Sequence, residues 1–150
     1  MNAFELLKED HKKVSEIFAK LEETTERAVK TREEVFARLQ TELEIHTRIE
    51  EQIFYPAIKD AEETHDITLE AYEEHAVVKT LLGELAKEPK DTEEWAAKLK
   101  VLKENVEHHV EEEEGEMFPD ARKVLSREQV EALGERMEAA KKEEKRAAAG

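Results

Sequence analysis

A histidine–glutamate motif that occurs twice constrains this chain more than any other feature of its sequence. His46 and Glu50 form the first copy, and His109 and Glu113 form the second. On an α-helix, positions i and i+4 lie on the same face, one turn apart. Each copy therefore places an imidazole and a carboxylate side by side. Two such faces turned toward each other provide the donors that a two-metal site needs.

The two copies belong to a longer internal repeat. A histidine precedes each copy at nearly the same spacing, His11 in the first half and His75 in the second, and a proline follows each copy, Pro56 and Pro119. The halves therefore predict two helical hairpins of one design. Two hairpins of this length pack as an up-down-up-down four-helix bundle, so we expect an all-α fold of that kind with a short extra C-terminal helix.

The composition favours helices and restricts the chemistry. Charged residues make up 42% of the 150 residues, whereas the chain has only four glycines and three prolines, which is typical of helical proteins. The absence of cysteine excludes disulfides, iron–sulfur ligation and thiol catalysis. Histidine, aspartate, glutamate and tyrosine remain as the strong metal donors.

The net charge of −15 restricts the partners. It argues against binding to nucleic acid or to an anionic membrane surface, because both would repel the chain. It also makes copies of the chain repel each other, so we expect a monomer or a weak dimer. The first residues do not form a signal peptide, and no apolar run is long enough to span a membrane. These features predict a cytoplasmic protein.

Apolar residues at spacings of three and four predict where the helices lie. Four long helices and one short one are expected, over residues 2–27, 31–57, 66–87, 91–119 and 126–140. Their starts are marked by capping residues: Asn2, the capping boxes Thr31–Glu34 and Ser126–Gln129, and Asp66. Pro56 is expected to kink or end the second helix. We therefore assign a bundle domain to residues 1–120, and a short helix with a tail that frays from Lys141 to residues 121–150.

Six ionisable side chains stand on the apolar faces of these predicted helices, where leucine would be expected: His11, His46, Glu50, His75, His109 and Glu113. A single histidine on such a face is ordinarily a hydrogen-bonded core residue, and a single glutamate is ordinarily solvated. Burying a carboxylate without a partner is costly, however, and these faces offer no lysine or arginine. Bound cations would remove this cost and the repulsion between the two carboxylates. The repeat therefore favours a metal site.

The order of these residues, H…H-x-x-x-E…H…H-x-x-x-E, resembles the hemerythrin family, and specifically its HHE cation-binding domains. The resemblance covers residues 1–120 and implies a non-haem di-iron site in a left-handed four-helix bundle. It implies that the two irons are held by two histidine pairs and two bridging glutamates beside an oxo or hydroxo group: His11 with His46, His75 with His109, and Glu50 with Glu113. Ferritin-like di-iron proteins use E-x-x-H motifs with more carboxylates, and no inward-facing pair of such motifs is apparent here.

One departure from the family pattern affects the expected chemistry. Oxygen-carrying hemerythrins have a fifth histidine one turn from the ligand on the third helix, whereas here the turns on either side of His75 hold Ala71 and Lys79. The irons would therefore have room for exogenous ligands or for one further protein donor. An iron with an exchangeable position can cycle between states, which favours an enzyme over a simple carrier.

Two residues are candidates for that further donor. A straight helix would turn Tyr55 well away from Glu50, but a kink at the following proline would bring its phenolate, a reasonable ferric ligand, toward the metal. His108 is rotated by about 100° from His109 around the helix, so a flanking role is favoured over ligation. His65 lies in a predicted loop and is expected to be solvated.

Three functions remain compatible with this interpretation. The protein could bind oxygen or nitric oxide for storage, delivery or sensing; it could turn over peroxide or nitric oxide; or it could buffer iron without catalysis. Imidazole and carboxylate donors suit iron, manganese and zinc alike, and the resemblance selects iron. A dry pocket suited to small ligands is expected from the surrounding apolar residues: Phe18, Leu43, Ile53, Val78, Leu82, Leu102 and Val106.

Overall fold

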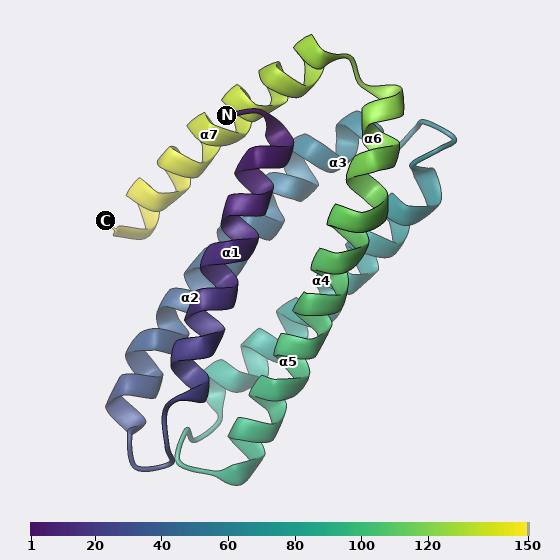
Figure 1. Ribbon diagram of the computed structural model, residues 1–150. Helices are drawn as coiled ribbons and strands as arrows, with labels where there is room; N and C mark the ends of the chain where they lie inside the picture. The colour runs from purple at the N-terminus through teal and green to yellow at the C-terminus, as the bar shows by residue number, and fades with distance from the viewer. Residues whose placement is uncertain (150) are drawn as a thin grey trace.

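Residues 1–149 are described by a computed structural model, and all of its regular elements are helical. Four long helices form a bundle in which each runs antiparallel to the one before it (Figure 1): α1 (Ala3–Glu22), α2 (Val29–Ile49), α4 (His65–Lys87) and α5 (Glu93–Glu112). Two of them continue through π-helical turns at the same end of the bundle: α2 through η1 (Glu50–Phe54) into α3 (Tyr55–Ile58), and α5 through η2 (Glu113–Met117) into α6 (Phe118–Val124). A fifth long helix, α7 (Arg127–Ala149), lies along α1 and α2. The predicted all-α bundle is confirmed.

Two apolar cores lie on either side of a polar band that crosses the middle of the bundle. One core lies at the end of the bundle that carries the α1–α2 and α4–α5 loops, and it contains Phe18, Leu39, Leu82, Trp95 and Leu102, among others. The core at the opposite end contains Phe4, Phe54, Tyr55, Phe118 and Met137, among others. Across residues 1–149, no helix combines the length and the apolar character needed to cross a lipid bilayer.

Some predicted helix starts are confirmed and two are wrong, because Asp66 is not the cap of α4, which begins at His65, and Thr31 is not the cap of α2. Asn2 caps α1 through a capping box with Glu5. The capping box predicted at Thr31 is wrong, because α2 already begins at Val29. Tertiary contacts hold this first turn in place of a local cap: the buried Arg32 side chain donates to the Thr24 hydroxyl at 2.9 Å and to a backbone carbonyl of the α4–α5 loop at 2.6 Å.

The two π-helical turns replace the simple kink that the sequence predicted at the first proline. The backbone N–H of Tyr55 donates to the carbonyl of Glu50, five residues earlier, and the N–H of Phe118 donates to Glu113 in the same way. A π-helical turn contains about one residue more than an α-helical turn, so it rotates the side chains that follow. The side chains at 54, 55 and 58 are therefore buried, rather than the predicted Ile53 and Ala57.

The fifth helix is longer than the sequence predicted. We expected a short helix that frays from Lys141, but α7 continues to Ala149; the last residue of the predicted tail, Gly150, lies outside the described residues. Charged side chains of this segment pair with residues of the bundle. Lys145 pairs with Glu42 at 3.5 Å, and Glu144 pairs with Arg48 at 2.5 Å.

Two glycines allow a matched test of how tightly α7 is docked. A Cβ atom on Gly134 of α7 would lie 2.3 Å from the backbone oxygen of Met1, whereas a Cβ atom on Gly83 of α4 would meet nothing within 4 Å. Gly134→Ala is expected to destabilise the fold by about 1–3 kcal/mol through overpacking. Gly83→Ala should stabilise it by about 0.5–1 kcal/mol, because alanine favours a helix interior. Urea denaturation of both variants checks the opposite signs, and equal effects would contradict the close docking.

Candidate metal centre

The six predicted donors meet in the polar band between the two cores. Each comes from a helix or from the π-helical turn that follows it: His11 (α1), His46 (α2), Glu50 (η1), His75 (α4), His109 (α5) and Glu113 (η2). All six side chains are buried. Their donor atoms form two groups, each within 4.8 Å, and both groups contain the same two glutamates. One group adds His11 and His46, and the other adds His75 and His109.

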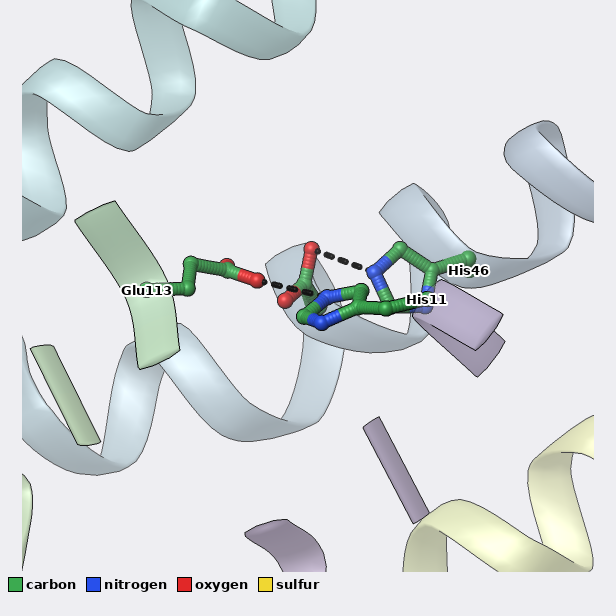
Figure 2. Close-up of side chains that lie close together, drawn as sticks. His11, His46 and Glu113 are labelled. Atoms are coloured by element: carbon green, nitrogen blue, oxygen red, sulfur yellow. Dashed lines mark hydrogen bonds and ion pairs between the residues drawn. The ribbon is translucent and has the colours of Figure 1, made fainter. Parts of the chain in front are cut away.

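Each glutamate faces one imidazole from each histidine pair. Glu113 lies 3.0 Å from Nε2 of His11 and 3.1 Å from Nε2 of His109. Glu50 lies 3.2 Å from Nε2 of His46 and 3.0 Å from Nε2 of His75. Figure 2 shows His11 directed toward Glu113, with the His46 ring beside it. The arrangement suits two cations that share both carboxylates.

A second carboxylate orients each of the four imidazoles, and sequence reasoning missed this layer. In every case the ring atom Nδ1 donates to an acidic side chain on a neighbouring helix or on the π-helical turn that continues it. The pairs are His11 with Glu114 (2.6 Å), His46 with Asp10 (3.0 Å), His75 with Glu51 (2.7 Å) and His109 with Glu74 (2.5 Å). The contact fixes the tautomer and leaves Nε2 free to face the centre. The available signal was that each of these acids directly precedes or follows a candidate ligand in the sequence.

Several buried atoms of the centre lack hydrogen-bond partners. Nε2 of His46 and both carboxylate oxygens of Glu50 have no such partner among the described residues, although they lie close together. Orphaned buried polar atoms are costly. These residues belong to the groups whose donor atoms lie within 4.8 Å of one another, which fits coordination to a cation. Imidazole nitrogen and carboxylate oxygen are common ligands of divalent metals.

The pKa shifts of the metal-free protein also indicate that the buried carboxylates require positive charge beside them. Burial alone would raise the pKa of Glu50, but His46 and neighbouring groups hold it well below its usual value. Burial alone would lower the pKa of His46, but Glu50 and Asp10 raise it to about 10. For His109, Glu113 likewise outweighs burial and raises the pKa to about 12. Protons on imidazoles thus compensate the buried carboxylates when no metal does so.

The phenol of Tyr55 also reaches the centre. Its hydroxyl lies 3.3 Å from Nε2 of His75 and 3.2 Å from Nε2 of His109, and it donates to Glu113. Burial and the facing carboxylates raise its pKa well above the usual value. The π-helical turn, rather than a proline kink, brings it inward, because five residues of π-helix return Tyr55 close to the face of Glu50.

The repeat makes the two halves of the centre similar but not identical. Phe118 follows Glu113 in the second copy as Tyr55 follows Glu50 in the first. The Phe118 ring lies parallel to the His11 ring, with 6.3 Å between centroids. One half of the centre therefore has a hydroxyl next to its histidine pair, and the other half has an apolar ring.

The two remaining histidines lie away from the six donors. The side chain of His108 is 65% exposed and pairs with Glu112 at 2.7 Å on the outer surface. His108 belongs to neither of the two donor groups that contain Glu50 and Glu113, and its flanking role stays a prediction. His65 is exposed, as expected, but it begins α4 instead of lying in a loop, and its Nδ1 donates to the Lys59 carbonyl at 2.8 Å.

A small cavity adjoins the imidazoles on the side away from the tyrosine. Its volume is about 20 Å³, and its apolar wall consists of Val14, Leu43, Val78, Val106 and Val110. The predicted pocket is thus partly confirmed: Phe18, Leu82 and Leu102 pack in the core beyond it, and Ile53 packs against the opposite core. A more open hollow of about 200 Å³ between α1 and α5 shares His11 and three of these valines.

Together, the fold and the site define a class of protein: a helical bundle with buried histidine and glutamate clusters suited to binding metal cations. The sequence model of the hemerythrin HHE cation binding domain matches residues 2–121. The chain belongs to this family.

Two other proteins are similar to this chain in structure or in sequence. A crystal structure of a hemerythrin HHE cation binding domain-containing protein from Mycobacterium kansasii, a homologue of Rv2633c, matches with a TM-score of 0.85 and 31% identity, covering 99% of this chain and 90% of that one. A Nostoc protein named DNA nickase is 28% identical over 141 residues, which is 94% of this chain and 39% of the relative. The chain therefore spans about two fifths of that relative's length.

Proposed function

We propose that this protein is a non-haem di-iron protein that binds, or reacts with, a small ligand such as oxygen, nitric oxide or hydrogen peroxide. His11 and His46 would hold one iron, and His75 and His109 the other. Glu50 and Glu113 would be shared. The observation that carries the proposal is the pair of buried donor groups with both glutamates in common.

Two observations support iron over the other metals that such donors accept. The chain belongs to the hemerythrin HHE family, and a buried phenol stands beside one histidine pair. Bound iron would supply redox chemistry and exchangeable coordination positions. The protein's own residues do the rest: the outer carboxylates orient the imidazoles, and the apolar cavity wall excludes bulk water.

The cavity supports a small ligand. A volume of about 20 Å³ is sufficient for roughly one water-sized molecule. A cavity of this size favours small ligands over bulky organic molecules. Iron buffering without catalysis is the alternative that would leave the cavity unused. Nickase activity is not proposed for this chain, because its charge of −15 opposes approach to a phosphate backbone.

Optical spectroscopy of the iron-loaded protein tests the proposal and distinguishes its forms. Charge-transfer bands that disappear on deoxygenation and return with oxygen would identify a carrier or sensor. Rapid loss of added peroxide, with the bands surviving, would identify an enzyme. Bands that respond to none of the three ligands would contradict ligand binding and leave iron buffering.

Tyr55→Phe is expected to alter one iron selectively. Removing only the hydroxyl should leave the fold and the iron content unchanged, but abolish any tyrosinate-to-iron absorption band, because the phenol stands beside His75 and His109. Tyr72→Phe is the matched control, since the Tyr72 hydroxyl donates to the Glu51 carbonyl instead. A spectrum that responds equally to both substitutions, or to neither, would argue against Tyr55 as a ligand.

A further inference from the structure

The fifth helix places one lysine against the outer layer of the metal centre. Lys141 of α7 donates to Oδ1 of Asp10 on α1. The lysine side chain is only 15% exposed, and the aspartate side chain is 3% exposed. The ion pairs that α7 makes with α2 lie nearer the surface than this one. The side chain of Lys145, for example, is 40% exposed.

Asp10 connects this lysine to a candidate metal ligand. Its second oxygen, Oδ2, accepts from Nδ1 of His46 at 3.0 Å, and Nε2 of the same ring faces Glu50 at 3.2 Å. A continuous chain of contacts thus runs from α7 through Asp10 to His46. Fixing both carboxylate oxygens fixes the plane of the carboxylate, and with it the orientation of the imidazole.

We propose that Lys141 is a positioning residue: it holds Asp10 against His46, so that α7 completes the half of the centre formed by His11 and His46. This inference rests on the proposed two-metal function. It goes beyond the family domain, because the family match ends at residue 121 and Lys141 lies on the helix that follows.

The other half of the centre provides an internal comparison. Glu74 corresponds to Asp10 in the repeat, and it accepts from Nδ1 of His109 at 2.5 Å. Among the described residues, the other basic side chain within 4 Å of Glu74 is that of His108, whose Nε2 lies 3.8 Å away and whose side chain is 65% exposed. The inner contact is therefore repeated, but the buried lysine is not. Loss of Lys141 should affect only one of the two metal ions.

The expected effect follows from charge burial. Without the ammonium group, Asp10 would be a buried carboxylate with one oxygen unpaired, which favours rotation toward water. His46 would then lose the contact that orients it. Loss of such an outer contact typically weakens metal binding about 10- to 100-fold. We therefore expect Lys141→Met to release the ion at His11 and His46 at least about tenfold faster, with the second ion unchanged.

The test measures Fe²⁺ release from the full-length, anaerobically loaded protein to a coloured ferrous chelator. Lys141→Met should convert release into two phases of one ion each, and Asp10→Asn should accelerate the same phase. Because the lysine acts through the aspartate, the double variant should release that ion no faster than Asp10→Asn alone. Glu74→Gln should accelerate the other phase, and combined with Lys141→Met it should accelerate both.

Two control variants separate positioning from simple docking of α7. Lys145→Met removes a neighbouring ion pair of the same helix and should leave both release rates unchanged, while Lys141→Arg should restore most of the wild-type rate. Unchanged release in Lys141→Met, or equal acceleration of both ions, would overturn the inference. Wild-type protein that holds fewer than two ions would instead overturn the proposed function, so the two failures are distinguishable.

Discussion

Glu50→Ala is expected to abolish binding of both metal ions. Glu50 belongs to both donor groups, and its two oxygens have no hydrogen-bond partner among the described residues. Its removal should therefore cost each ion a ligand and remove one of the two charges that attract the pair. Because bound metal stabilises only the folded state, the stabilisation it provides, about 4 kcal/mol at a metal concentration a thousand times the Kd, should be lost as well. Glu113→Ala should behave in the same way.

Metal analysis and thermal denaturation of purified variants check this result. Glu50→Gln keeps the side-chain volume and should lose metal without creating a cavity, which separates ligation from packing. Glu104→Ala removes the same group from the exposed face of α5 and should leave metal content and stability unchanged, as should His65→Ala. Two ions per chain in Glu50→Ala would contradict the shared-carboxylate arrangement.

Metal-free and metal-loaded protein are expected to respond differently to alkaline pH. In the metal-free fold the pKa of His46 is raised from 6.5 to about 10. The stability that this proton contributes is fully present below pH 6.5 and is lost as the pH rises toward 10. In the loaded protein, the ligand imidazoles are already deprotonated, as they are in the unfolded chain above pH 6.5. Its stability should therefore be nearly constant over this interval and fall below it, where protons compete with metal.

Urea denaturation between pH 6.5 and 10 measures both trends. The midpoint of the metal-free protein should decrease across this interval, while that of the loaded protein should not. Metal-free Glu50→Gln should show a shallower decrease, because the carboxylate is the largest influence that raises the pKa of His46. A metal-free midpoint that stays constant with pH would show that His46 is not held protonated by the buried glutamates.

The central features of the fold and of the site could be predicted from the sequence because they are periodic. The apolar faces and the six interrupting donors repeat at helical spacing, so the line from Phe4 through His11 to Leu21 is buried as expected. The same holds for His75 on α4 and His109 on α5. Helical spacing fixes a shared face, and burial of charged groups on that face requires compensation.

Other features depend on contacts that spacing alone does not encode. The π-helical turns after Glu50 and Glu113 insert one residue, so any extrapolation at α-helical period assigns the wrong face beyond them. The four outer carboxylates come from neighbouring helices or π-helical turns, and in a chain with 39 acidic residues only the three-dimensional packing selects them. The bundle residues that pair with α7, such as Asp10 and Glu42, are likewise distant from it in sequence.

The proposed two-metal site is tested most directly by metal analysis of the aerobically purified protein together with its optical spectrum. We expect about two irons per chain, with charge-transfer bands that are lost when the metal is removed and return when Fe²⁺ is added back in air. One ion per chain, zinc in place of iron, or a folded protein that takes up no metal would contradict the proposal.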